Sequence, residues 1–553
     1  MRSMDHVLSY ARTIASIPLH RTAYVPSEEE AANIKEMADE LRSIDVQIGE
    51  QISSLSERRA AVREQIALNN ALLSPCRRLP SEALSMIFLL AVPDDWEQAY
   101  AGQRSPNFAR VCRLWRNVAF DTPRLWSRLR LEAWIRWPSV GEASLLALEE
   151  DVERTAQVPL DVDVQMGSLV HRHPMPYASW DNFWGENDAW LLLRTLSHRW
   201  KRASFYNLPL SGYANLATCS FPALQTLAIH FAKYSHAIWR LDADTRQTMI
   251  LPNFQNAPNV TNLHIDVVPP MVTFELPRQW SITDLTINYA GGLDVAFESL
   301  LRAMMACSAT VRSCHISVEY DVNRSINRPE PIPQESTIFP CLEDIHFEDD
   351  AILLCYFIAA PHAINLRLSG YSYYNQFDAL ETMLDRSQAC QSLNTLSLAQ
   401  LRLIDEGSLL RCLRRLPSLR EVALAHDEYA ENICDPLITL DLVRALDISD
   451  VPYASEVLLP NLSRLVLTLG GWVRLWGDWQ QDERSFQDAL LSALRSRAEP
   501  LKLDGMPIQS LQSFVLDDSP CWPPCRDTIV RTFQRRRAMV IKQVSTDSET
   551  ESD

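Results

Sequence analysis

The chain has 553 residues, of which 47% are hydrophobic and 22% are charged, values that are typical of globular proteins. This composition excludes a collagen-like chain and an intrinsically disordered one. With 70 acidic and 52 basic side chains the net charge is -18, which would repel the phosphate backbone of a nucleic acid, so we expect no nucleic-acid partner.

Cysteine usage and hydropathy predict an intracellular protein of the cytoplasm, the nucleus or both. The 12 cysteines lie at irregular spacings, as reduced thiols do in a long chain. Asp5, His6 and Arg12 interrupt the apolar residues near the N-terminus, so no secretory signal is predicted. The longest clean apolar run, Ala351 to Pro361, is shorter than the roughly 18 residues that a bilayer-spanning helix needs. We therefore expect no membrane partner.

After a flexible segment at 1–26, residues 27–72 are predicted to form one long helix. Pro26, Ser27 and three acidic residues give a helix start signal. The apolar side chains that follow have the spacing of a coiled-coil seam: Ile34, Met37, Leu41, Ile44, Ile48, Ile52, Leu55, Val62 and Ile66. A charge near Arg59 and the repeated steps of four depart from strict heptads. Two interpretations stay open, a homodimeric coiled coil and a lone amphipathic helix lying on the rest of the protein.

Residues 74–128 predict a small helical domain. Pro80 suits a helix start, Ser81 is a good N-terminal capping residue, and Pro93 ends the helix about three turns later. From Ala83 to Val92 only Ser85 is polar, so this helix is apolar nearly all round. A second amphipathic helix carries its apolar residues on one face: Phe108, Val111, Cys112, Trp115 and Ala119.

Together the segments "LPSEALSMIFLLAVP" and "VCRLWRNVAFDTPRLW" resemble the F-box. The matching residues, in order, are Leu79, Pro80, Glu82, Leu84, Ile87, Phe88, Val111, Cys112, Trp115, Arg116, Leu125 and Trp126. A coiled coil before an F-box and loose repeats after it are similar to the expanded F-box families of mushroom-forming fungi. Two features depart from the family pattern: Ala83 stands where a bulkier aliphatic residue is frequent, and the loop between the two halves is longer.

The resemblance implies that one apolar face of the first helix belongs to the domain's own core. Its other face, with the matching residues around it, would bind the Skp-type adaptor of a cullin ubiquitin ligase. The alternative is a helix buried wholly inside this chain, which is the ordinary reason for a helix to be apolar all round.

A connecting or capping region is expected at 129–199, and degenerate leucine-rich repeats at 200–518. The repeat is an apolar residue, two variable residues, an apolar residue, one variable residue and another apolar residue. Copies begin at Leu224, Val260, Ile282, Val311, Leu342, Ile364, Leu393, Leu419, Val443, Leu462 and Leu511. Most intervals are near the roughly 20 to 29 residues of leucine-rich repeats. Helical segments between the copies predict an α/β solenoid with a parallel sheet in an irregular curve.

Strand alternation places the variable polar positions of the copies on the concave side of this sheet. We expect a target protein to bind there, on Asn262, Asp284, Ser313, Asp344 and Glu421. A plain solvated face is the alternative.

Three histidines share one variable position of the repeat. His264, His315 and His346 each occupy it, and Asp266 and Glu348 follow two residues after the first and the third. If the copies at Val311 and Leu342 form adjacent strands, the last two histidines lie about 4.8 Å apart. A metal site or a pH-sensitive partner contact is one interpretation. Half-buried polar residues on a sheet face are favoured, so neither a metal nor a cofactor is predicted.

Other segments carry no catalytic or cofactor motif. The patterns G-x-G-x-x-G, G-x-x-x-x-G-K, G-x-S-x-G and H-E-x-x-H do not occur. Cys521 and Cys525 have no second ligand pair after them, which indicates a turn with two thiols rather than zinc. His171 to Pro174 is expected in a surface loop. The C-terminal tail, 519–553, should be disordered from about residue 542 because its end lacks apolar residues.

The sequence therefore predicts a non-catalytic adaptor of a ubiquitin ligase. The F-box-like helices would bind the Skp-type adaptor and, through it, a cullin, and the repeats would hold an unknown target protein. Two alternatives remain: a scaffold whose repeats bind a partner without ubiquitin, and an enzyme whose site is assembled from dispersed residues.

Overall fold

The computed structural model describes residues 4–22, 24–92, 107–133, 140–166, 187–208, 210–231, 251–268, 275–289, 293–318, 336–370, 375–388, 391–401, 406–425, 437–468 and 479–517. The chain divides into two compact units, Met1–Asp121 and Thr122–Asp553. Among the helices in these ranges, none combines the length and the hydrophobicity that crossing a bilayer requires. The predictions for His171 to Pro174, for Cys521 and Cys525 and for the tail at 519–553 lie outside the described residues.

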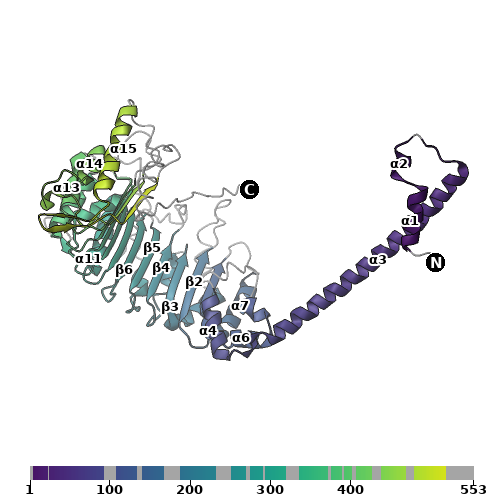
Figure 1. Ribbon diagram of the computed structural model, residues 1–553. Coiled ribbons are helices and arrows are strands. Elements are labelled where there is room, and N and C mark those ends of the chain that lie inside the picture. The colour runs from purple at the N-terminus through teal and green to yellow at the C-terminus, as the bar shows by residue number, and fades with distance from the viewer. Residues whose placement is uncertain are drawn as a thin grey trace. The chain divides into compact units, whose positions relative to one another are not determined.

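A helix of 46 residues, α3 (Glu28–Leu73), dominates the first unit, as predicted (Figure 1). A capping box begins it. The Ser27 hydroxyl accepts a hydrogen bond from the Glu30 backbone N–H at 3.3 Å, and the Glu30 carboxylate accepts one from the Ser27 backbone N–H at 2.8 Å. Two otherwise unpaired backbone donors are thereby satisfied at the start of the helix.

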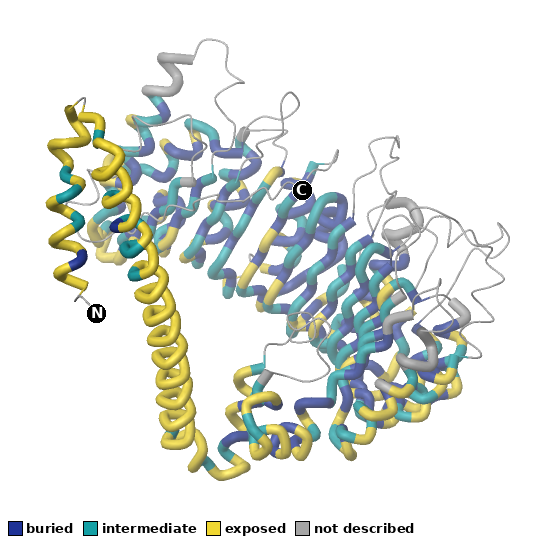
Figure 2. Tube along the Cα trace, turned by 90° about the vertical axis from the view of Figure 1, so that its right-hand side faces the viewer, coloured by how far each residue is buried: buried dark blue, intermediate teal, exposed yellow. Residues whose placement is uncertain are grey.

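Helix α1 (Met4–Ile14) packs beside the first part of α3, and a short helix, α2 (Ile17–His20), follows it. Val7 and Met37 are buried in this contact, so the segment 1–26, expected to be flexible, contains a docked helix. Its Val7, Ala11 and Ile14 have helical spacing on one face. Farther along α3 the apolar side chains of the predicted seam are exposed, which Figure 2 shows as a long yellow stretch: Ile48, Ile52, Leu55, Val62 and Ile66.

Two short helices follow α3, after the turn η1 (Pro75–Arg78). Helix α4 (Ser81–Ala91) matches the predicted first helix, but Pro80 takes the N-cap position and Ser81 is already helical, so Ser81 is not the cap. The predicted second helix is broken into η2 (Asn107–Arg110) and α6 (Arg113–Phe120). Cys112 causes the break because it is extended and its sulfur accepts a hydrogen bond from the Trp115 backbone N–H at 3.5 Å, as an N-cap does.

The second unit is built on one sheet of 13 strands, all parallel, whose spatial order follows the chain (Figure 1). The strands are β1 (Arg128–Ala133), β2 (Leu160–Met166), β3 (Trp200–Tyr206), β4 (Thr226–His230), β5 (Asn262–Val268), β6 (Asp284–Tyr289), β7 (Ser313–Val318), β9 (Asp344–Asp349), β11 (Asn365–Ser369), β12 (Thr395–Ala399), β13 (Glu421–Ala425), β14 (Arg464–Thr468) and β17 (Ser513–Asp517). Two small sheets accompany it, β8 (Thr337–Ile338) with β10 (Ile358–Ala359) and β15 (Leu501–Leu503) with β16 (Met506–Ile508).

Helices connect the strands and cover one face of the sheet. They are α7 (Val140–Arg154), α9 (Asp188–Thr195), α10 (Leu210–Ala214), α11 (Leu293–Cys307), α12 (Gln376–Arg386), α13 (Glu406–Arg414), α14 (Leu440–Leu446) and α15 (Trp479–Ser496), with short 3-10 helices at η3 (Pro123–Trp126), η5 (Ser197–Arg199), η7 (Leu251–Phe254), η8 (Asp350–Tyr356) and η9 (Ala454–Glu456). Strand residues such as Leu227 and Leu396 share one hydrophobic core with Met304 of α11 and Leu490 of α15. The unit is thus a solenoid-like α/β fold, in which each strand relies on its neighbours to complete the core.

All predicted copies coincide with strands except the one at Val443, which was wrong. Val443 lies in α14, where the Thr439 hydroxyl accepts a hydrogen bond from the Leu442 backbone N–H at 3.2 Å and caps the helix. The sheet also begins earlier than residue 200, because β1 and β2 lie in or next to the region 129–199 that was expected to connect. Strand β1 carries the repeat pattern in "WSRLRL", from Trp126 to Leu131, which was not counted as a copy, and β2 alternates apolar and polar residues without the full pattern.

Candidate functional site

One face of α4 belongs to the chain's own small core. Leu84 and Phe88, four residues apart, are buried. The Phe88 ring stacks on Phe108 with 4.3 Å between ring centroids and contacts Trp115 at 5.2 Å. Phe88 therefore holds α4 against η2 and α6 through aromatic contacts, which add to the burial of apolar area.

The other face of α4 exposes large apolar side chains. Met86 is 62% exposed, Ile87 43% and Leu90 87%. We call these three residues the apolar surface of α4. Val111 and Leu114, at the start of the next helical segment, are exposed as well. Contiguous exposed apolar side chains are a mark of interaction sites.

The remaining residues of the predicted adaptor site fall into two groups. Pro80 and Glu82 are exposed near the start of α4, and Leu79 is half-buried there. Leu125 and Trp126 are buried in the second unit, where the Arg154 guanidinium lies 4.7 Å from the Trp126 ring centroid. Among the residues that match the F-box, Pro80, Glu82, Ile87, Val111 and Arg116 are exposed, and the others are buried or half-buried.

A second candidate surface is the polar face of the sheet, which we call the open face. Neighbouring strands pair in register, so one residue from each strand forms a continuous row. The predicted target-binding residues all lie in this first row, which reads Arg128, Asp161, Arg202, Thr226, Asn262, Asp284, Ser313, Asp344, Asn365, Thr395, Glu421, Arg464 and Ser513.

Charge is unevenly distributed along the first row. Arginines lie near both of its ends, whereas Asp284 and Asp344 lie near its middle. Glu421 is already paired, because its carboxylate lies 3.0 Å from the Arg464 guanidinium. Asp284 accepts a hydrogen bond from the neighbouring Thr283 hydroxyl at 2.7 Å. The middle of the row is therefore its acidic part.

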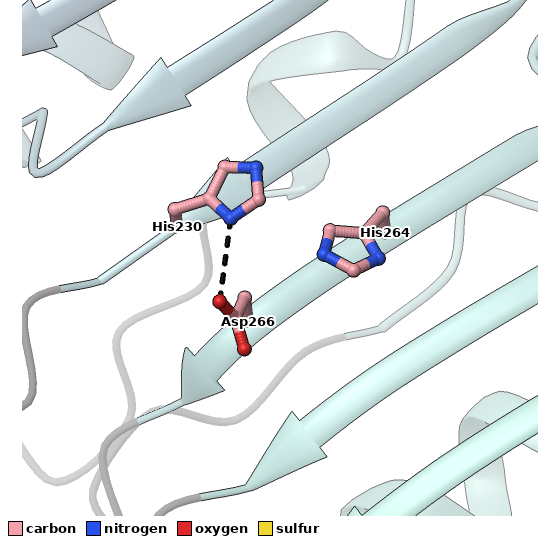
Figure 3. Close-up of side chains that lie close together, drawn as sticks. All are labelled: His230, His264 and Asp266. Carbon is pink, nitrogen blue, oxygen red and sulfur yellow. Dashed lines mark hydrogen bonds and ion pairs between the residues drawn. The ribbon is translucent and has the colours of Figure 1, made fainter. Parts of the chain in front are cut away.

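Beside the first row, histidines gather on the open face. His230 of β4 and Asp266 of β5 are paired across the two strands, and the His230 Nδ1 lies 3.5 Å from the Asp266 Oδ2 (Figure 3). His264 lies two residues before Asp266 on β5, and its ring centroid is 5.0 Å from that of His230. The Asn288 side-chain amide donates a hydrogen bond to the Asp266 Oδ1 at 2.9 Å.

A second cluster of the same composition lies on β7 and β9. The rings of His315 and His346 stack with centroids 4.1 Å apart. The Glu348 Oε1 lies 3.0 Å from the His346 Nε2 and 3.6 Å from the His315 Nε2. Burial, helped by the positive charge that His315 can carry, lowers the pKa of His346 to about 4. Burial also lowers the pKa of His264, so both imidazoles are neutral near pH 7.

The register confirms the predicted neighbourhood of His315 and His346, which are directly paired. His264 is two strands away from His315, with Thr286 between them, and associates instead with His230. His230 was missed in the sequence because each copy was read as six residues, and this histidine is the residue that follows "LQTLAI". One more alternate position per strand would have found it.

Comparisons with known proteins add no relative to these observations. No family model matches this chain, and a search of curated proteins finds no significant match. The two surfaces, the apolar surface of α4 and the open face, are therefore the basis for inferring the function.

Proposed function

We propose that the chain is a non-catalytic, substrate-recognition adaptor of a Skp–cullin–F-box ubiquitin ligase. The apolar surface of α4 would bind the Skp-type adaptor, and the open face would bind a target protein. The observation that carries this proposal is the two-sided α4. Leu84 and Phe88 complete the local core, yet three large apolar residues on the same helix remain in water. A helix that served only internal packing would have no use for them.

We further propose that the second unit is a degenerate leucine-rich-repeat solenoid that presents the target. Its strands stack in chain order with helices on one face, and the opposite face carries a continuous polar row. An adaptor of this kind performs no covalent chemistry. It raises the effective concentration of a target lysine near a conjugating enzyme that other subunits supply.

The experiment measures binding of the full chain to a purified Skp-type adaptor. Ile87→Lys would place an unpaired charge in a desolvated contact, which costs several kcal/mol, so we expect affinity to fall by about 100-fold or more. Met305→Lys is the matched control, because Met305 of α11 is 50% exposed and lies on the other unit. Unchanged binding by Ile87→Lys, with circular dichroism unchanged, would refute the proposed contact.

Phe88→Lys does not serve the same purpose, although Phe88 belongs to the F-box resemblance. Its ring is 1% exposed, so a lysine there would disrupt the core and remove binding for a trivial reason. Leu90→Lys, at a side chain that is 87% exposed, is the better second variant. Loss of binding in both Ile87→Lys and Leu90→Lys would map the contact to one face of α4.

Target binding is tested by reversing charge in the middle of the first row. We expect Asp284→Lys, Asp344→Lys and Glu421→Lys together to weaken capture of a lysine-rich peptide, while binding of the Skp-type adaptor is retained. The effect should be largest at low salt, because exposed charges are screened within about 10 Å at 0.1 M. Glu421→Lys would also place a second cation beside Arg464, so the double variant Asp284→Lys and Asp344→Lys is measured alone to test the acidic middle of the row. Unchanged capture would place the target elsewhere.

The scaffold alternative shares the open face but not the ligase. Affinity recovery from cell extract distinguishes the two. An adaptor recovers the Skp-type protein together with a cullin, and Ile87→Lys loses both. A scaffold recovers neither, with or without the substitution.

A further inference from the structure

His230, His264 and Asp266 form a cluster that the proposed adaptor function does not use. Each residue offers one nitrogen or oxygen atom, and these three atoms lie within 4.8 Å of one another. We propose that this cluster binds one divalent transition-metal ion of the zinc class. Imidazole nitrogen and carboxylate oxygen are ligands that zinc takes in proteins.

The register of β4 and β5 builds the cluster. His230 is paired with Asp266 across the two strands, and His264 is paired with Ala228. Because Ala228 has only a methyl group, no long side chain stands between the His264 ring and His230. Figure 3 shows the three side chains on the same face, with His230 and Asp266 directed toward each other and His264 beside them.

The two rings are inclined to each other rather than stacked, which is compatible with one ion lying in both ring planes. A metal lies in the plane of each imidazole that binds it, so the two ring planes must intersect near the ion. The planes of His230 and His264 meet at 47°. Zinc bonds of roughly 2.0 to 2.2 Å in a tetrahedron place neighbouring ligand atoms about 3.3 to 3.6 Å apart. The 3.5 Å between the His230 Nδ1 and the Asp266 Oδ2 is close to that separation.

Neighbouring side chains hold the ligands in place. Tyr206 stacks on the His230 ring at 4.3 Å, with only 3° between the ring planes. Asn288 donates its hydrogen bond to the Asp266 Oδ1, which leaves the Oδ2 for the ion. Contacts of this kind orient metal ligands and raise affinity. The side chains of His230 and Asp266 are 20% and 34% exposed, so an ion can enter from solvent, and a fourth position remains for water or for a group of a docked protein.

The cluster of His315, His346 and Glu348 has the same ligand types but a geometry that is unsuitable. Its rings are nearly parallel, at 14° and 4.1 Å, so their planes do not meet at bonding distance. Arg367 is paired with His346 on the neighbouring strand and adds a positive charge. We therefore assign the ion to the first cluster and use the second as a matched control.

The experiment is a calorimetric titration of the full, reduced chain with Zn²⁺ after treatment with a chelator. We expect one ion to depend on the cluster. His264→Ala and Asp266→Asn should each weaken that binding at least 100-fold, and His315→Ala should leave it unchanged. Asn288→Ala, which removes only a supporting contact, should weaken it about 10- to 100-fold.

Titration with Co²⁺ identifies the ligands, because cobalt bound to thiolates shows an intense charge-transfer band that nitrogen and oxygen ligands do not give. The assignment would be overturned if the chain bound no ion or if His264→Ala still bound it. It would also be overturned if His315→Ala lost binding to the same extent, or if the Co²⁺ complex showed a thiolate band that His264→Ala removes. His264→Gln keeps a polar side chain of similar size, so it should fold normally and still lose the ion, which separates loss of a ligand from a folding defect. Ile87→Lys should bind the ion normally, so failure of this inference and failure of the adaptor function are distinguishable.

Discussion

The two faces of α4 predict opposite consequences for two adjacent alanine substitutions. Phe88→Ala removes a ring that is 1% exposed and stacked at 4.3 Å on Phe108. Burial of this kind makes the substitution cost about 3–5 kcal/mol in unfolding free energy, including roughly 0.5–1.5 from the aromatic contacts. Ile87→Ala shortens a side chain that is already 43% exposed, so its cost should stay near 0.5 kcal/mol.

Hydrogen exchange of the full chain measures both changes locally. At about 1.4 kcal/mol per tenfold, Phe88→Ala should accelerate exchange of the amides in α4 and α6 by at least 100-fold, which amounts to loss of their protection. Ile87→Ala should change the same amides less than about 3-fold, and the strands of the second unit should be unaffected in both variants. Equal deprotection by the two substitutions would show that the assignment of the buried and exposed faces is wrong.

Three further predictions concern other parts of the chain. The apolar side chains of the predicted seam of α3 are exposed beyond its contact with α1. We therefore expect the full chain to dimerise as its concentration is raised in sedimentation experiments, and Ile52→Lys to prevent dimerisation. A chain that stays monomeric at every concentration would contradict the coiled coil. Gly370 has a φ of +99°, and an added Cβ would collide with the Asp349 carboxylate. Gly370→Ala should therefore lower the free energy of unfolding by about 1–3 kcal/mol and lower Tm. Gly505→Ala is the control and should have a smaller effect, because Gly505 has a φ of +78° but open space around it. The pKa of His346 falls from 6.5 to about 4 on folding, so between these pH values the unfolded chain binds more protons than the folded chain. The free energy of unfolding should therefore decrease as pH falls from 6.5 to 4. In urea titrations His346→Gln should make this decrease smaller.

Much of the sheet could be predicted because its core depends on local alternation. In "TLSL", from Thr395, and "EVAL", from Glu421, every second residue is buried, so an isolated strand already shows which face it will bury. The prediction of a repeat copy at Val443 was wrong because a short apolar run fits both the alternation of a strand and the spacing of a helix. Leu442, Val443 and Leu446 also have helical spacing, and the cap at Thr439 decides for the helix. Strand β1 was missed although "WSRLRL", from Trp126 to Leu131, fits the repeat, because Trp126 was assigned to the F-box-like segment.

The histidine cluster could be predicted only in part because it depends on which strands are neighbours. His230 and Asp266 are 36 residues apart, and only the pairing of β4 with β5 brings them together. The repeat indicated adjacent strands but not the order of the sheet at the insertions. The sequence likewise did not show which face of α4 is buried and which is exposed, because a helix that is apolar nearly all round has no polar face to mark the exposed side.

Packing does not explain where the histidines lie. The core requires the apolar residues that alternate with the open-face positions, and it leaves the open face free to vary. Yet the histidines of the open face lie between β4 and β9, whereas farther along the sheet the positions in line with His264 become Ser397, Ala423, Val466 and Val515. The first row stays largely polar over the same strands. The open face therefore carries two separate features, a long polar row whose middle is acidic and a local group of imidazoles, and a target could bind the first while an ion occupies the second.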